Sequence, residues 1–135
     1  MNFRIKKTLT PNDTGENGSH QAGLHVPKKK EVLQFFPKLA NKKNPFQLIC
    51  FKDNSGKEWE FKFIYDNNKF FGTGTRYEYR ITCMTEFFRA YALKSGDIIY
   101  FEKKENSYLI TFEKQDTDSG LNFRTMDLWE VEFDD

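Results

Sequence analysis

The chain has 135 residues, the size of one ordinary domain, and combines 15 Phe, six Tyr and two Trp with 30% charged residues. This composition supplies the apolar material for one core and excludes wholesale disorder, while the longest apolar runs fall far short of the roughly 18 residues of a membrane span. The opening MNFRIKKTLT lacks an apolar signal segment, and the isolated Cys50 and Cys83 argue against a structural zinc site and fit a reducing cytoplasm.

The charge along the chain is uneven, although the net charge is only +1. Residues 1–96 carry 17 Lys and Arg against 9 Asp and Glu, whereas residues 97–135 carry 4 against 11. A basic segment of this length indicates an anionic partner for the first two-thirds of the chain.

The first part of the chain predicts two strands, a loop and a helix. The loop sequence TPNDTGENGS is dominated by turn-forming residues, and the helix has its apolar residues on one side before Pro37 ends it. In chain order we expect a strand over 2–9, the loop over 10–19, a strand over 20–26 and the helix over 28–39.

The rest of the chain predicts hairpins around one further helix, which would begin at Thr85 as its N-cap. Segments rich in aromatic and β-branched residues predict the strands, and Asp53-Asn54-Ser55-Gly56 predicts a hairpin turn between the first two. The expected strands cover 46–53, 57–65, 75–82, 97–103, 107–114 and 125–133, with a polar loop over 116–122. This pattern is typical of a mostly-β barrel or sandwich.

The sequence contains no established catalytic pattern. Two histidines, His20 and His25, are too few for a three-ligand zinc centre, and HExxH, phosphate-loop and GxSxG patterns do not occur. Asp53, Glu60 and Lys62 have the spacing of the Mg²⁺ site of many restriction nucleases. Because charged residues alternate with aromatic ones along this strand, a solvated face explains the pattern better, and a free-standing Mg²⁺-dependent nuclease is kept as the alternative.

Two polar regions carry side chains of the kind that read double-stranded DNA. Arg pairs with guanine, Glu accepts from the cytosine amino group, Asn or Gln pairs with adenine, and Lys, Ser, Thr and backbone N–H groups hold phosphates. The first region is the loop and strand over 10–25, which follows Lys6 and Lys7. Its polar residues are Asn12, Thr14, Asn17, Ser19, His20, Gln21 and His25. A surface loop with self-capping side chains is the other interpretation of this region.

The second region is the segment over 69–82, KFFGTGTRYEYRIT. Its Gly-containing start lets the backbone approach a phosphate closely. As a strand it would alternate, with Arg76, Glu78 and Arg80 on one face and Tyr77, Tyr79 and Ile81 on the other. The charged face is either a row of base-reading side chains or an exposed salt-bridge ladder.

These motifs together resemble known DNA-binding domains. TPNDTGENGSHQAGLHVP, FP at 36–37 and GTGTRYEYRIT resemble the N-terminal DNA-recognition domain of EcoRII-like restriction endonucleases. KDNSGKEWEFKFIY, RITCMTEFFRAYALKSGDIIYFEK and the closing hairpin resemble the plant pseudobarrel of auxin- and abscisic-acid-response transcription factors, the B-three type. The resemblance is strongest over 4–114 and implies a seven-stranded open DNA-binding pseudobarrel with two short α-helices. It also implies that residues 1–135 are one domain of a longer restriction enzyme.

The resemblance implies two arms that enter the major groove, an N-arm over 10–25 and a C-arm over 72–80. Arg76 and Arg80 would read guanine, and Glu78 would read cytosine or orient the arginines. The implied base-reading residues are Asn17, His20, His25, Arg76, Glu78, Tyr79 and Arg80. The implied phosphate-binding residues are Lys6, Lys7, Asn12, Thr14, Ser19, Gln21, Lys69, Thr73, Thr75 and Tyr77. Tyr79 stands where that enzyme has Lys, His25 where it has Tyr, and a Gly-Thr run replaces a lysine-containing approach, so the target sequence stays open.

The implied partner is double-stranded DNA with a short, G·C-containing site, and the implied location is the bacterial cytoplasm, away from any membrane. This domain would need no cofactor, because Mg²⁺ would serve only a nuclease domain elsewhere in the full-length protein. A module for single-stranded nucleic acid, oligosaccharide or protein is a further alternative. Its stacking platforms would be Phe70, Phe71, Tyr77 and Tyr79.

Overall fold

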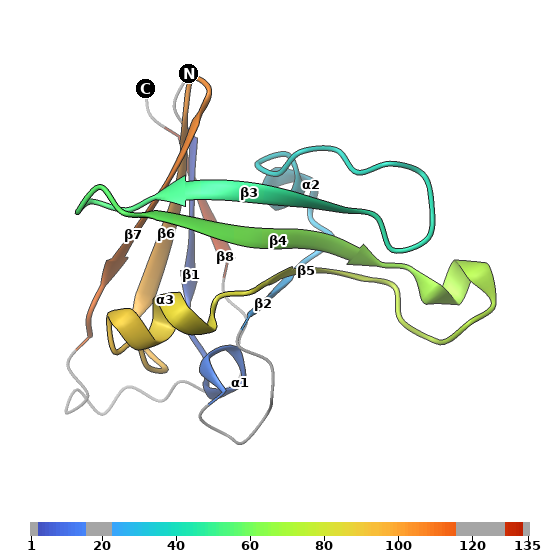
Figure 1. Ribbon diagram of the computed structural model, residues 1–135, viewed down its shortest axis with the longest axis horizontal. Helices are drawn as coiled ribbons and strands as arrows, with labels where there is room; N and C mark the ends of the chain where they lie inside the picture. The colour runs from blue at the N-terminus through green and yellow to red at the C-terminus, as the bar shows by residue number, and fades with distance from the viewer. Residues whose placement is uncertain (1–2, 16–22, 116–128, 134–135) are drawn as a thin grey trace.

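The computed structural model describes residues 3–15, 23–115 and 129–133, and its central feature is one strongly curved eight-stranded sheet (Figure 1). Short helical segments lie between the strands. The elements in chain order are β1 Phe3–Thr8, α1 Pro11–Thr14, β2 Leu24–Val26, α2 Lys30–Leu33, β3 Phe46–Lys52, β4 Glu58–Asp66, η1 Asn68–Phe71, β5 Glu78–Thr82, α3 Thr85–Ala90, β6 Ile98–Lys104, β7 Ser107–Glu113 and β8 Trp129–Phe133.

The strand order β2-β5-β4-β3-β7-β6-β1-β8 makes an open barrel. All pairs are antiparallel except β3 with β7, which joins the two halves through only two residue pairs, Phe51 with Tyr108 and Lys52 with Leu109. The two edge strands are linked by a side chain, because Trp129 Nε1 of β8 donates to the carbonyl oxygen of His25 in β2 at 3.0 Å. The predicted mostly-β open barrel is confirmed, with eight strands in place of the seven implied by the resemblance.

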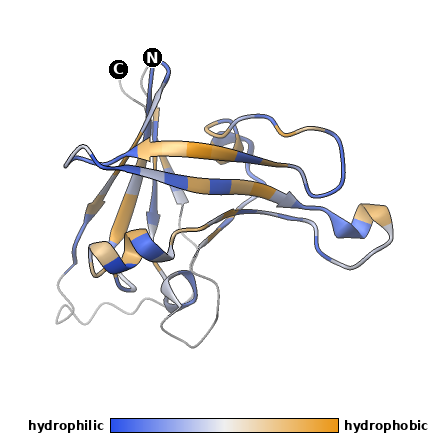
Figure 2. Cartoon of the chain, in the orientation of Figure 1, coloured by the Kyte–Doolittle hydropathy of each residue, from blue (hydrophilic) through white to orange (hydrophobic). Residues whose placement is uncertain are grey.

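The core lies inside the curve of the sheet and is dominated by phenylalanine. Trp59, Phe61 and Phe63 alternate with charged residues along β4, so one face of the strand is buried and the other is solvated (Figure 2). Phe35, which follows α2, and Phe87 of α3 are fully buried among other aromatic rings. Each buried ring contributes about 1.5–3 kcal/mol relative to exposure, so the aromatic-rich sequence accounts for a stable domain.

Several expected elements differ from the structure in extent. The predicted helix over 28–39 is confined to α2, because the chain then leaves the helix and turns Phe35 and Phe36 into the core. The predicted loop over 10–19 contains α1, and the predicted strand over 75–82 begins only at β5. Thr85 is the first residue of α3, and Met84 is its N-cap. The loop over 116–122, and the beginnings of the strands predicted over 20–26 and 125–133, lie outside the described residues.

None of the helices in the described ranges is long and apolar enough to cross a membrane.

Candidate nucleic-acid interface

The position of β5 between β2 and β4 decides which charged side chains meet. His25 is paired with Arg80 across β2 and β5, and Glu78 is paired with Asp66 across β5 and β4. Paired residues on neighbouring strands point to the same side of a sheet, so these four share the outer face, while Tyr79 is on the inner face. The predicted alternation is confirmed for β5, whereas Arg76 and Tyr77 precede the strand.

Asp66 is the centre of the charges on this face. Its Oδ2 accepts from Arg80 Nε at 2.6 Å, lies 2.6 Å from Arg80 Nη2 and lies 3.8 Å from Arg76 Nη1. The side chain of Arg80 is 18% exposed and that of Arg76 is 53% exposed. The carboxylate therefore holds Arg80 in place, whereas Arg76 presents most of its guanidinium to solvent.

Glu78 of the C-arm lies beside His25 of the N-arm. Its Oε2 is 3.8 Å from His25 Nε2, which makes an ion pair when the imidazole is protonated, and its Oε1 is 3.9 Å from Arg80 Nε. Both contacts are long for a hydrogen bond, so Glu78 keeps acceptor capacity for another donor. Arg80 and Asp66 thus form a salt bridge of the kind expected in a ladder. The side chains of Arg76, Glu78 and His25 remain accessible to solvent.

Tyr79 belongs to the packing of the sheet. Its ring is stacked on Tyr65 at 4.2 Å between centroids and on Phe63 at 5.7 Å, and it contacts the buried core. Burial raises the pKa of its hydroxyl. We therefore correct the predicted base contact of Tyr79, because its ring faces inward on the side of β5 opposite Glu78 and Arg80.

The exposed ring of Tyr77 contacts side chains from two segments that are distant in sequence. Lys28 Nζ, from the segment after β2, lies 3.4 Å from the ring centroid, and Lys69 Nζ, from η1, lies 4.3 Å from it. Phe70 meets the same ring edge-on at 6.1 Å. A groove of about 610 Å³ runs alongside, lined by His25, Pro27, Lys28, Thr75, Arg76, Tyr77 and Glu78. Residues of the N-arm and C-arm, 50 positions apart in sequence, therefore form one surface.

The connection between β4 and β5, which contains η1 and the start of the C-arm, extends from the barrel (Figure 1). Asn67 and Asn44 exchange hydrogen bonds at its base, each side-chain oxygen accepting from the other's backbone N–H. Lys69 N donates to Arg76 O at 3.0 Å, and Gly72 takes the left-handed conformation with φ of 70°. These bonds hold the arm in shape while Lys69, Thr73 and Thr75 stay exposed, as a phosphate contact requires.

The root of the N-arm is anchored by a buried ion pair. Lys7 Nζ lies 2.8 Å from Asp13 Oδ2, and both side chains are almost completely buried. The same carboxylate accepts from Thr10 N, and Thr10 Oγ1 accepts from Asp13 N, which completes the capping box of α1. The predicted phosphate contact of Lys7 is wrong, because its ammonium is enclosed and bonded to Asp13 and to the Thr8 carbonyl.

The other N-arm predictions have mixed outcomes. Lys6 is 3.2 Å from Glu130 and 3.7 Å from Glu132, and the hydrogen bond to Glu130 raises the pKa of Lys6, so this cation is already occupied by carboxylates. Asn12 is exposed on α1, and Thr14 is half-buried. Asn17, Ser19, His20 and Gln21 lie outside the described residues.

Gly23 has a steric role at the start of β2. A Cβ atom there would lie 2.4 Å from the carbonyl oxygen of Ile81 in β5, closer than any real contact. The glycine of the HQAG motif therefore lets β2 approach β5, which brings His25 beside Arg80.

Comparison with known proteins agrees with this architecture. The family model described as restriction endonuclease EcoRII, N-terminal, matches residues 3–102. The chain belongs to this EcoRII-N family. The type II restriction enzyme EcoRII of Escherichia coli is 37% identical over 88 residues, which are 62% of this chain and 21% of that enzyme. Auxin response factor 2 of Oryza sativa subsp. japonica is 32% identical over 103 residues, which are 76% of this chain and 13% of that protein.

A solved structure has the same pseudobarrel fold. The Arabidopsis FUS3-DNA complex contains a chain that matches with a TM-score of 0.63 and 25% identity, covering 82% of this chain and 96% of that one. The EcoRII-N domain thus shares its fold with the plant transcription-factor pseudobarrel. It spans only 21% and 13% of the curated relatives that it matches.

The alternative metal site does not assemble in this EcoRII-N domain. Asp53 is buried, where it accepts from Ser55 N at 2.8 Å, from Trp59 Nε1 at 2.9 Å and from the Tyr91 hydroxyl. Burial alone would raise its pKa, but the bonds from Ser55, Tyr91 and Trp59 outweigh burial and hold the pKa well below its usual value. Glu60 is exposed on the opposite side of β4.

Lys62 Nζ lies over the Phe46 ring, 4.4 Å from its centroid. The described ranges contain no cluster of three His, Cys, Asp or Glu residues able to hold a metal ion.

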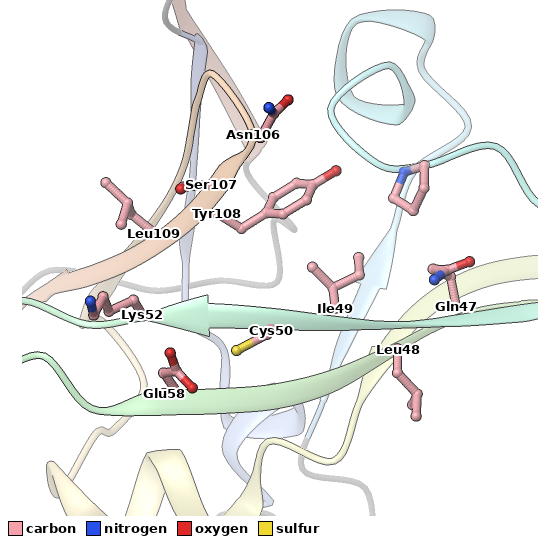
Figure 3. Close-up of a pocket in the computed structure, with 11 residues that line it drawn as sticks. Gln47, Leu48, Ile49, Cys50, Lys52, Glu58, Asn106, Ser107, Tyr108 and Leu109 are labelled. Carbon is pink, nitrogen blue, oxygen red and sulfur yellow. The ribbon is translucent and has the colours of Figure 1, made fainter.

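A second hollow, of about 460 Å³, lies between β3 and β7, where the two strands diverge from their short parallel contact (Figure 3). Leu48, Cys50 and Tyr108 line it together with the charged Lys52 and Glu58. Desolvation, then the charge of Glu58, raises the pKa of the Cys50 thiol, so this thiol is not activated as a nucleophile. The hollow lacks the row of arginine and carboxylate groups found in the groove beside Tyr77.

Sequence reasoning missed two residues of this interface, Asp66 and Lys28. Asp66 ends the alternating strand EWEFKFIYD on its polar side, which is a usable signal once its partner strand is known. Lys28 begins the run KKK directly after Pro27, but its position beside Tyr77 depends on the meeting of two segments distant in sequence.

Proposed function

We propose that this DNA-binding EcoRII-N domain recognises a short, specific site in double-stranded DNA. The N-arm (residues 10–25) and the C-arm (residues 72–80) would enter the major groove from either side. The observation that carries the proposal is the groove in which His25 of the N-arm meets Arg76 and Glu78 of the C-arm. The fold that this domain shares with a chain of the FUS3-DNA complex supports this assignment.

The accessible groups of the groove match the edges of a G·C base pair. Arg76 can offer two donors to O6 and N7 of guanine, and Glu78 can accept from the amino group of cytosine. Arg80 acts mainly through its neighbours, because Asp66 already binds its Nε and Nη2. His25 adds an N-arm contact beside Glu78, so the two arms read adjacent positions.

Phosphate contacts fix the register of the domain on the duplex. Exposed Thr73 and Thr75 take this role on the C-arm, as does Lys69 on η1 just before it. Asn12 and Thr14 take it at the start of the N-arm. The N-arm residues outside the described ranges, Asn17, Ser19, His20 and Gln21, keep their proposed DNA contacts.

The longer protein is proposed to be a type II restriction endonuclease whose catalytic domain lies elsewhere. The 37% identity with EcoRII supports this, and the buried state of Asp53 argues against catalysis by this domain. DNA binding by this domain then requires no metal ion, and Mg²⁺ serves only the nuclease domain.

Selection of bound duplexes from a randomised oligonucleotide pool tests the proposal directly. We expect a short consensus sequence that contains at least one G·C pair. Arg76→Ala should reduce the base preference at one position of this consensus. Recovery of a pool without any consensus would contradict sequence-specific recognition.

The segment η1 is partly hydrophobic although it extends from the barrel (Figure 2). Its Phe70 and Phe71 are 63% and 46% exposed, which favours single-stranded nucleic acid as a second candidate ligand. Aromatic side chains of this kind stack on unpaired bases. Tyr79 does not contribute to such a surface, because its ring is already stacked on Tyr65 within the sheet. Competition between duplex and single-stranded forms of one oligonucleotide separates the candidates, because stronger competition by the single strand would favour the second.

A further inference from the structure

The two lysines on Tyr77 form an unusual arrangement of like charges. Their Nζ atoms lie 3.4 and 4.3 Å from one ring centroid, so Lys28 and Lys69 are brought close together. Because both Nζ atoms lie close to one ring centroid, the two ammonium groups are at most about 8 Å apart. This separation does not exceed the Debye length of about 8 Å at physiological salt, so screening is incomplete and the two charges repel each other. The attraction of each cation to the ring offsets this repulsion.

Within the described ranges, neither Lys28 nor Lys69 has a carboxylate within the 4.0 Å of a salt bridge. Asp66 binds Arg80, and Glu78, the carboxylate that lines the groove, lies beside His25 and Arg80. An anion that enters this surface from outside would therefore remove the repulsion and contact both ammonium groups.

We infer that Lys28 and Lys69 form a clamp for one DNA phosphate, with the Tyr77 ring holding both lysines in place. The inference rests on the proposed duplex binding and adds Lys28 to Lys69, which the sequence already predicted as a phosphate contact. Because Lys28 follows β2 and Lys69 belongs to η1, a phosphate bound between them ties the end of the N-arm to the C-arm. The clamp is independent of base sequence, because a phosphate carries no base identity.

The charge of the clamp can be tested with Lys28→Gln, Lys69→Gln and the double variant. Lys38→Gln is the matched control, because Lys38 is exposed and lies beside Pro37, which lines the other hollow. Affinity is measured across a salt series for two duplexes, one from the randomised selection and one with the same bases shuffled. Circular dichroism and thermal unfolding confirm that each variant is folded.

We expect each single variant to bind both duplexes about tenfold more weakly, with base preference unchanged. Because the two lysines share one phosphate, the double variant should lower the slope of log affinity against log salt by about one, not two. Binding by Lys28→Gln equal to that of Lys38→Gln, or a slope change of about two, would overturn the clamp.

The role of the ring is tested without changing the charge. Tyr77→Phe keeps the aromatic face, so Lys28→Gln should weaken binding in that background as it does in the wild type. Tyr77→Leu should bind both duplexes about threefold more weakly than Tyr77→Phe, because the lysines are no longer held. Equal binding by the two variants would remove Tyr77 from the inference.

If the wild type binds both duplexes equally, the proposed base reading is contradicted, while the effect of the lysine variants on affinity can still be measured. If it binds neither duplex, both proposals fail.

Discussion

A buried aspartate lies near each end of strand β4: Asp53 is in the short turn before it, and Asp66 is its last residue. At the start, Asp53 accepts hydrogen bonds from Ser55, Trp59 and Tyr91, all of them neutral donors. At the end, Asp66 accepts from a charged donor, Arg80, and lies near Arg76. The two carboxylates have similar burial, 5% and 7% exposed, but different kinds of partner.

The partners decide what each aspartate does. The donors around Asp53 belong to its own turn, to β4 and to the C-cap of α3, so this carboxylate fastens secondary structure together. Arg76, 3.8 Å from Asp66, lines the groove, so this carboxylate lies beside a group that can bind a ligand. We infer that one end of β4 is built for stability and the other for recognition, and each experiment below separates the two.

The largest effect is expected from Asp53→Ala on stability. The substitution leaves the buried Trp59 Nε1 and the Tyr91 hydroxyl without their acceptor, which should lower the free energy of unfolding by about 3 kcal/mol. Urea unfolding measures the loss, and Asn54→Ala in the same exposed turn serves as the control. DNA affinity of the folded variant should be unchanged, and a loss of affinity as large as the loss of stability would remove the distinction between the two ends.

The next effect is expected from Arg76→Ala on DNA binding. Loss of a bidentate guanine contact should cost about 1–3 kcal/mol on the selected duplex and relax preference at one position, with little change in stability. Arg76→Lys keeps the charge but loses the fork, so it should retain the salt dependence and still lose base preference. Arg89→Ala, an exposed arginine on α3, is the control. Equal loss on every sequence would assign Arg76 to phosphate.

The strands at the centre of this comparison could be predicted because their signal is local. Alternation of Trp59, Phe61 and Phe63 with charged residues defined β4, and the same alternation placed Glu78 and Arg80 on one face. The resemblance supplied the pseudobarrel and the two arms, which periodicity alone could not provide.

The errors concern residues whose role depends on distant partners. Lys7 and Lys6 look alike in sequence, but strand alternation turns Lys7 inward to Asp13 and leaves Lys6 beside acidic β8. Tyr79 was ambiguous until its neighbour Tyr65 was known. Lys28 acquires a role only because β2 pairs with β5 and brings it to Tyr77.

A pH series sharpens the assignment of Asp53. Its pKa is lowered in the folded state, so the carboxylate stabilises the fold fully above its unfolded pKa of about 3.9, and this contribution is lost as the pH falls toward the folded pKa. The stability difference between the wild type and Asp53→Asn should therefore narrow below about pH 4, by at most about 1.4 kcal/mol per pH unit. Other titrating groups are common to both proteins and cancel. A difference that is constant from pH 7 to pH 3 would contradict the role of the charged form.

The smallest expected effect is that of metal removal, because neither end of β4 is arranged to hold an ion. EDTA at constant ionic strength should leave duplex affinity unchanged, and Glu60→Ala should bind and unfold like the wild type, since Glu60 is exposed on the solvated face. Incubation of the domain with plasmid DNA and Mg²⁺ should leave the plasmid uncut. If the plasmid is cut and Glu60→Ala abolishes the cutting, the free-standing nuclease is the correct alternative. Asp53 would then have to leave its bonds to Trp59 and Tyr91 and reach the other side of the strand. Because those bonds are what the first substitution measures, a large stability loss in Asp53→Ala makes such a rearrangement costly, and the two experiments constrain each other.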